Sequence, residues 1–190
     1  MSAAGGPLVL VGGGARSGKS RFALARALAL GEGGVFVATA EGSDDEMRAR
    51  IARHREERGE RLRTVEAPLD LPGALRRIFE EDRAADVVLV DCLTLWLSNL
   101  LVKGESADEA LRRVEELRGV LARRRLPIVL VTNEVGMGLV PETPLGRTFR
   151  DVAGLAHQRL ARDADEVHVG VLGLMLRLRP GPIAVSEPGP

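Results

Sequence analysis

One eight-residue segment near the start of this chain constrains its fold more than any other feature. The segment reads Gly13-Gly14-Ala15-Arg16-Ser17-Gly18-Lys19-Ser20 and fits the pattern G-x-x-x-x-G-K-[ST]. An apolar run at residues 8–11 precedes it and predicts a buried strand, and residues 20–30 predict a helix. A strand, a glycine-rich turn and a helix in this order predict a phosphate-binding loop, because backbone N–H groups of the turn and of the first helical turn face phosphate oxygens.

The use of lysine supports a phosphate contact at Lys19. Of the 27 Lys and Arg residues, only Lys19 and Lys103 are lysines. A compact ammonium group reaches between the β- and γ-phosphates of a nucleotide, where a planar guanidinium fits poorly. We therefore predict that the loop binds a purine nucleoside triphosphate and that Lys19 is catalytic. The alternative is a glycine-rich turn that binds nothing.

Two oxygen-bearing side chains are predicted to hold Mg²⁺ beside this loop. The hydroxyl of Ser20 follows the lysine, and Asp91 ends an apolar run at residues 87–90 that predicts another buried strand. A carboxylate at the end of such a strand can hold the Mg²⁺ that accompanies a nucleotide. The alternative for Asp91 is an ordinary turn residue. A phosphate-binding loop predicts the class of ligand but not the reaction.

Strand and helix patterns alternate along the chain. They predict an α/β fold of the RecA-like P-loop NTPase type, with a mainly parallel central sheet flanked by helices and a C-terminal antiparallel hairpin. The predicted strands are residues 8–11, 35–40, 87–91 and 128–132, followed by hairpin strands 166–171 and 174–179 around Gly173. The predicted helices are residues 20–30, 44–58, 69–83, 107–125 and 148–162.

Length and composition predict one domain. A chain of 190 residues can bury a full hydrophobic core, so we expect residues 1–190 to form a single nucleotide-binding domain, ordered over about 8–179. The Gly- and Pro-rich ends, 1–6 and 180–190, are expected to be loose. No apolar stretch reaches the roughly 20 residues that span a membrane, and no targeting segment is evident, so we expect a cytoplasmic protein. The single cysteine, Cys92, lies in apolar surroundings and is expected to be a buried, inert thiol.

One of the three histidines lies in a strongly basic segment. At helical spacing, Arg50, His54 and Arg58 share one stripe of the predicted helix 44–58. Neighbouring positive charges favour a neutral imidazole, which is the form that attacks phosphorus. The residues alone nevertheless favour a solvated helix face on which His54 is incidental. His157 and His168 are interpreted as structural.

Four segments occur in a recognisable order: GGARSGKS at 13–20, DDEMRARIARHREER at 44–58, TNEVGMGLVPETPLGRTFRDVAG at 132–154 and QRLARDADEV at 158–167. In these segments the chain resembles the bifunctional adenosylcobinamide kinase / adenosylcobinamide-phosphate guanylyltransferase family of cobalamin biosynthesis. The resemblance extends over about residues 8–179, and the block that contains TNEVGMG is far more specific than the phosphate-binding loop.

The resemblance implies two reactions on a corrinoid substrate. The aminopropanol hydroxyl of adenosylcobinamide is phosphorylated with ATP or GTP, and GMP is then transferred from GTP to that phosphate to give adenosylcobinamide-GDP. The second reaction passes through a GMP-histidine, which makes His54 the nucleophile and reverses the interpretation from the residues alone. The resemblance also implies a homotrimer, and guanine-nucleotide contacts at Gly13, Gly14, Ala15, Arg16, Ser17, Gly18, Lys19, Ser20, Ala38, Thr39, Ala40, Arg55, Glu56, Glu57, Arg58, Glu66 and Asp91.

The chain departs from the family pattern at two of these positions. Some members have serine in place of Ala40, so a contact here must come from the backbone. Some have glutamate in place of Asp91, which leaves open whether the shorter side chain contacts guanosine or only Mg²⁺.

Two other functions remain as alternatives. A plain P-loop small-molecule kinase would not need His54. A RecA-like ATPase that binds nucleic acid is less consistent with a net charge of zero and an aromatic share of 3%.

Overall fold

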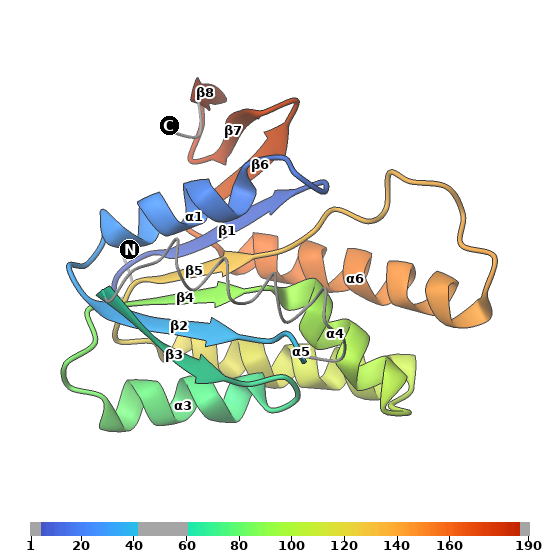
Figure 1. Cartoon of the computed structure of the whole chain (residues 1–190), viewed down its shortest axis with the longest axis horizontal. Coiled ribbons are helices and arrows are strands. Elements are labelled where there is room, and N and C mark those ends of the chain that lie inside the picture. The colour runs from blue at the N-terminus through green and yellow to red at the C-terminus, as the bar shows by residue number, and fades with distance from the viewer. Residues whose placement is uncertain (1–4, 42–60, 187–190) are drawn as a thin grey trace.

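The apolar runs predicted as strands form the centre of one eight-stranded sheet (Figure 1). The computed structural model describes residues 5–41 and 61–186. The strands are β1 (Leu8–Gly13), β2 (Gly34–Ala38), β3 (Leu62–Glu66), β4 (Val87–Asp91), β5 (Ile128–Val131), β6 (Glu166–Val171), β7 (Leu174–Arg179) and β8 (Ala184–Ser186). The helices are α1 (Lys19–Leu28), α3 (Leu71–Glu81), α4 (Leu93–Val102), α5 (Ala107–Ala122) and α6 (Pro144–Asp163).

The order of the strands places the phosphate-binding loop near the middle of the sheet. The order is β3-β2-β4-β5-β1-β6-β7-β8. Neighbouring strands from β3 to β6 are parallel, and β7 and β8 are antiparallel additions. The carboxyl ends of β2, β4, β5 and β1 therefore meet at one edge of the sheet, where open α/β sheets bind ligands. The predicted fold class, including the C-terminal hairpin, is confirmed.

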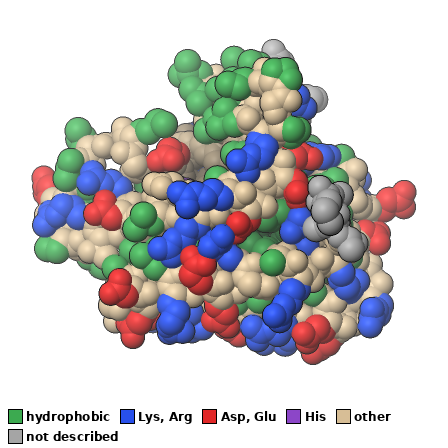
Figure 2. Space-filling view, turned by 180° about the vertical axis from the view of Figure 1, so that it is seen from behind, with side chains coloured by type: hydrophobic (Ala, Val, Ile, Leu, Met, Phe, Trp, Pro, Cys, Tyr) green, Lys and Arg blue, Asp and Glu red, His purple; other side chains and the backbone are tan. Residues whose placement is uncertain are grey.

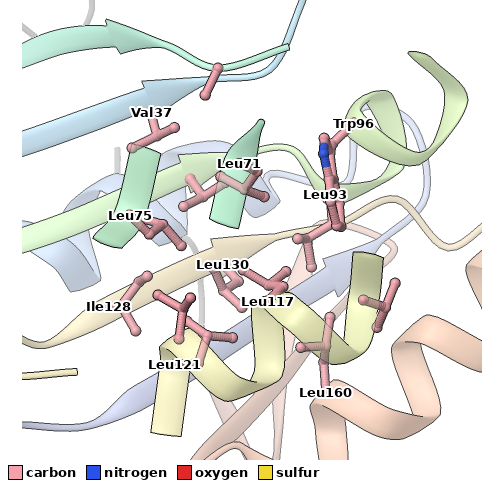
Figure 3. Packing of buried hydrophobic residues seen from close by; sticks show 14 of the residues in the cluster. Val37, Leu71, Leu75, Leu93, Trp96, Leu117, Leu121, Ile128, Leu130 and Leu160 are labelled. Atoms are coloured by element: carbon pink, nitrogen blue, oxygen red, sulfur yellow. The ribbon is translucent and has the colours of Figure 1, made fainter. Parts of the chain in front are cut away.

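Both faces of the central strands are buried, which explains their continuous apolar sequences. In β1, Leu8 and Leu10 belong to one core cluster, whereas Val9 and Val11 belong to the other. The first cluster lies between the sheet and helices α3 to α6, and Figure 3 shows leucines of α3 and α5 pointing toward β5. The second lies beneath α1, which contributes Ala23 and Ala27.

Side-chain caps determine where three helices begin. Asp70 accepts a hydrogen bond from the Gly73 N–H at 3.0 Å at the start of α3, and Ser106 forms a capping box at the start of α5. Thr143 accepts a hydrogen bond from the Gly146 N–H at 3.1 Å, with Pro144 as the first helical residue. The helix predicted at 148–162 therefore starts four residues earlier, at Pro144.

Two elements were not predicted because their sequences lack the usual periodicity. The strand β3 lies at the edge of the sheet, and most of its side chains are exposed or half-buried, so it has no apolar run. The helix α4 reads LTLWLSNLLV; six of its ten residues are buried, and its apolar residues are not confined to one face. Periodicity alone cannot distinguish such a helix from a buried strand.

The ends of the chain differ from the expectation of loose tails. Residues Ala184–Ser186 form β8, which extends the antiparallel hairpin along β7. Near the other end, the Arg124 side chain donates a hydrogen bond to the Gly6 carbonyl at 3.0 Å. The predicted helix 44–58 lies outside the described residues. None of the described helices is both long and apolar enough to cross a membrane.

Candidate functional site at the carboxyl edge of the sheet

The glycine-rich turn links β1 to α1 in the predicted strand-turn-helix arrangement. Gly18, which precedes the helix, has a φ of 85°, a left-handed conformation that favours glycine. Gly13 has a φ of 152°, and a Cβ atom there would lie 2.6 Å from the Ser17 hydroxyl oxygen. Glycine is therefore required at Gly13, because the turn closes tightly over the end of β1.

Lys19 is the first residue of α1 and is held against the turn. Its side chain is buried, with a relative exposure of 7%, and its ammonium group donates a hydrogen bond to the Gly14 carbonyl at 3.0 Å. The ammonium is thus placed where the turn begins. Ser20 follows it and is half-buried.

Asp91 ends β4 at the same edge and is half-buried. Burial raises the pKa of the adjacent Cys92 thiol; the Asp91 carboxylate raises this pKa further, and the Lys19 ammonium opposes the rise. Both charges therefore act on one buried thiol, which places them in the same part of the edge. The prediction that Cys92 is buried is confirmed.

Ser20 and Asp91 suit a magnesium ion bound together with a nucleotide. Mg²⁺ prefers oxygen ligands and is usually held by one or two carboxylates together with water and substrate phosphates. Within residues 5–41 and 61–186 no group of three or more His, Cys, Asp or Glu side chains could hold a metal ion. A hydroxyl and a single carboxylate beside a phosphate-binding turn match the nucleotide-dependent type of site.

The residues that the resemblance assigns to guanine nucleotide also lie along this edge. Ala38 is opposite Glu66 on one side and opposite Asp91 on the other, so the three form a row across β3, β2 and β4. Glu66 is exposed, whereas Thr39 is fully buried. The segment that contains His54 and Arg55 to Arg58 lies outside the described residues.

Hydrogen bonds connect this edge from β2 to the phosphate-binding turn. The Thr39 hydroxyl donates to the Cys92 carbonyl at 2.7 Å and accepts from the Cys92 N–H at 2.8 Å. The Cys92 sulfur is 3.1 Å from the Thr94 hydroxyl, which accepts from the Asn133 side-chain amide at 2.9 Å. The next residue, Glu134, donates its N–H to the Gly13 carbonyl at 3.0 Å. We call this series the edge network.

The polar residues of α4 are a signal that the sequence analysis missed. Thr94 belongs to the edge network, and the Asn99 amide donates to the carbonyls of Thr39 at 2.8 Å and Pro68 at 3.0 Å. Polar side chains in an otherwise apolar helix need partners, because an unpaired buried polar group is costly. Thr94 and Asn99 could therefore have been assigned to contacts with neighbouring loops.

The segment after β5 leaves the edge network and enters solvent. Glu134 accepts a hydrogen bond from the Gly136 N–H at 2.6 Å, after which Met137 and Leu139 are 89% and 95% exposed. Arg147 donates to the carbonyls of Pro141 at 3.0 Å and Glu142 at 2.7 Å. It thereby ties the end of the segment to the start of α6.

His157 supports the end of β5 from α6. Its Nε2 atom is 2.6 Å from the Thr132 hydroxyl. Burial lowers the pKa of His157, and the nearby Glu134 carboxylate partly opposes this shift, which also shows that the carboxylate lies within electrostatic range of the ring. His168 instead lies on β6, where it contacts Glu166 and the Phe22 ring, and burial lowers its pKa too.

Comparison with known proteins gives a family match over most of the chain. Residues 9–178 match the family model described as cobinamide kinase / cobinamide phosphate guanyltransferase. The chain is 43% identical to the bifunctional adenosylcobalamin biosynthesis protein CobP of Pseudomonas aeruginosa, with 92% of this chain and 98% of that protein covered. It is 41% identical to the bifunctional adenosylcobalamin biosynthesis protein CobU of Salmonella typhimurium, with 90% and 99% covered.

Solved structures with low sequence identity share the fold. The RadB recombinase is 19% identical, with a TM-score of 0.54 over 96% of this chain and 87% of that chain. A KaiC-like protein from the hyperthermophilic archaeon Pyrococcus horikoshii is 16% identical, with a TM-score of 0.50 over 96% and 79%. These similarities establish the architecture of the sheet and helices, and they carry no argument about the reaction.

The buried hydroxyl of Thr39 can be tested for its part in holding the edge. Thr39→Val keeps the shape of the side chain but leaves the buried Cys92 N–H without its partner and removes one of the two hydrogen bonds to the Cys92 carbonyl. We expect the free energy of unfolding to fall by about 1–3 kcal/mol, measured by urea denaturation. Thr64→Val, at an exposed position on β3, is the matched control and should change it by less than about 0.5 kcal/mol. Equal stability of the two variants would contradict the role given to Thr39.

Proposed function

The chain belongs to the cobinamide kinase / cobinamide phosphate guanyltransferase family, and we propose that it carries out both reactions at the carboxyl edge of its sheet. It is a bifunctional transferase of cobalamin biosynthesis. This location of the active site is supported by one observation: Lys19, Ser20 and Asp91 lie together beside the phosphate-binding turn. A site of this composition binds a nucleoside triphosphate, and the family supplies the corrinoid that accepts its phosphorus groups.

In the kinase reaction, the turn and α1 bind the phosphates of ATP or GTP. Backbone N–H groups of residues 13–20 face the phosphate oxygens, and the Lys19 ammonium lies between the terminal two phosphates. Ser20 and Asp91 would hold Mg²⁺, which would neutralise charge on the phosphates. The aminopropanol hydroxyl of adenosylcobinamide attacks the γ-phosphorus, and the nucleoside diphosphate leaves.

In the guanylyltransferase reaction, we assign the nucleophile to His54. A ring nitrogen of His54 bonds to the α-phosphorus of GTP, and the bond to the β-phosphate oxygen breaks to release pyrophosphate. An oxygen of adenosylcobinamide phosphate then bonds to the same phosphorus, and the histidine leaves. The covalent intermediate divides one difficult displacement into two easier ones.

The guanine nucleotide contacts are proposed on the family pattern. The row formed by Ala38, Glu66 and Asp91 supports this assignment, because it places three of the assigned positions side by side at the edge. At Ala40 the contact must come from the backbone. The Thr39 hydroxyl is bonded to Cys92, and its N–H and carbonyl are bonded to Asp91 and Asn99, so Thr39 supports the assigned contacts by positioning its neighbours. The remaining assigned contacts are Arg55, Glu56, Glu57 and Arg58.

We propose that the protein is a homotrimer, as the family resemblance implies. Apolar side chains gather on the projecting C-terminal hairpin, where Figure 2 shows a hydrophobic surface. Leu172 is 97% exposed, and Ile183 and Val185 are 68% and 60% exposed. Such a surface is typical of a protein–protein contact. Sedimentation equilibrium should give the mass of three chains, and the mass of one chain would contradict the proposal.

The GMP-histidine can be detected directly by covalent labelling that is quenched with alkaline detergent, because its P–N bond survives in base. The protein and Mg²⁺ are mixed with α-labelled GTP or, separately, with γ-labelled GTP. We expect a protein-bound label from α-labelled GTP alone, unstable to acid and stable to base, as a phosphoramidate bond requires. His54→Ala should remove this label, and His168→Gln, on β6, is the control histidine variant that should retain it.

The same experiment separates the proposal from its nearest alternative. If neither nucleotide labels the protein while γ-phosphate still reaches adenosylcobinamide, the chain is a plain small-molecule kinase. A label that survives in His54→Ala would show that another residue is the nucleophile.

A further inference from the structure

Glu134 lies on the edge directly beside the phosphate-binding turn. It follows β5, which lies beside β1 in the sheet, and its N–H donates to the Gly13 carbonyl at 3.0 Å. The carbonyl of the next residue, Gly14, accepts the hydrogen bond from the Lys19 ammonium. Since Lys19 lies between the terminal phosphates of a bound nucleotide, Glu134 lies beside the γ-phosphate end of the site.

The other described carboxylates that end strands of this edge are committed elsewhere or lie farther away. Asp91 is the proposed ligand of Mg²⁺. Glu41 follows β2, and its carboxylate is 3.4 Å from the Lys103 ammonium. Glu66 ends β3, three strands away from β5 in the sheet order. Among these four carboxylates, Glu134 alone combines proximity to the phosphate-binding turn with the lack of an ion pair to any described residue.

The local contacts hold the Glu134 side chain at the surface of the site. One carboxylate oxygen accepts a hydrogen bond from the Gly136 N–H at 2.6 Å, which restrains the side chain without neutralising it. Its charge reaches the ring of His157, which burial keeps neutral near pH 7. The residue is half-buried, so it borders both the sheet and solvent.

The segment that follows Glu134 offers a surface for a large acceptor. Met137, Leu139 and Val140 expose apolar side chains within a few residues of the carboxylate. A corrin ring is a wide, largely apolar plate with polar groups at its rim. An acceptor that rested on this segment would lie within a few residues of the Glu134 carboxylate.

We propose that Glu134 is the catalytic base of the kinase reaction. The hydroxyl oxygen of the acceptor forms a bond to the γ-phosphorus while its proton passes to the Glu134 carboxylate. The bond between the γ-phosphorus and the bridging oxygen breaks, and the nucleoside diphosphate leaves with the electron pair. This inference rests on the proposed function, because it assumes that a hydroxyl is the acceptor at this site.

The test compares Glu134→Gln with Glu142→Gln in the full-length protein. Glu142 lies in the same segment and is exposed, so it is a matched control. We measure γ-phosphate transfer from labelled ATP to adenosylcobinamide, and the covalent label from α-labelled GTP. Glu134→Gln should lower kcat of the kinase reaction about 100- to 10,000-fold, the usual contribution of a general base. KM for ATP and the covalent GMP label should stay within about twofold of the native values, and Glu142→Gln should match the native protein in both assays.

Several results would overturn the proposal. One is a kinase kcat for Glu134→Gln within about threefold of the native value. Another is an unchanged kcat with a higher KM for adenosylcobinamide, which would make Glu134 a binding residue. Loss of the GMP label together with kinase activity would make its role structural. If the proposed function itself is wrong, the native protein will show neither the GMP label nor phosphate transfer to adenosylcobinamide. This result differs from failure of the Glu134 proposal, in which the native protein is active in both assays.

Discussion

The edge network is the constraint on which the rest of the site depends. Thr39, Cys92, Thr94 and Asn133 connect the ends of β2, β4 and β5, and Glu134 continues the connection to Gly13 at the end of β1. These groups are buried or half-buried. Loss of one of these hydrogen bonds would leave a buried polar group without a partner, because water cannot reach it, and would lower the stability of the fold. The network therefore fixes how the ends of these strands are positioned relative to one another. This also fixes the positions of Asp91 and Lys19.

The positions of the strand ends are well defined because helices pack against both faces of the central strands. Alternate residues of β1, β4 and β5 belong to two separate core clusters, one beneath α1 and one beneath α3 to α6. A strand that slipped by one residue would exchange these faces. Within the described residues, the groups proposed to be catalytic lie at or near the ends of such strands or in the first turn of α1, and the segment after Glu134 extends into solvent. A rigid edge beside an exposed segment suits a reaction that positions a small nucleotide tightly and admits a large corrinoid.

Much of the fold could be predicted from the sequence, because the phosphate-binding turn and the buried strands carry strong local patterns. The strand Val87–Asp91 and both strands of the hairpin have the predicted limits. The edge strand β3 and the largely buried α4 could not be predicted, since β3 has no apolar run and the apolar residues of α4 are not confined to one face. For the site, Lys19, Ser20 and Asp91 followed from the chemistry of phosphate binding. The guanine contacts and His54 required the family resemblance, because a basic helix face and a strand-end alanine have no distinctive physical pattern.

The most direct test of the account is to identify the products by mass spectrometry. The protein is incubated with adenosylcobinamide and Mg²⁺, first with ATP alone and then with ATP and GTP together. The account predicts adenosylcobinamide phosphate in the first mixture and adenosylcobinamide-GDP in the second. Unchanged adenosylcobinamide in both mixtures would contradict the account, and phosphate without the GDP product would contradict its guanylyltransferase half.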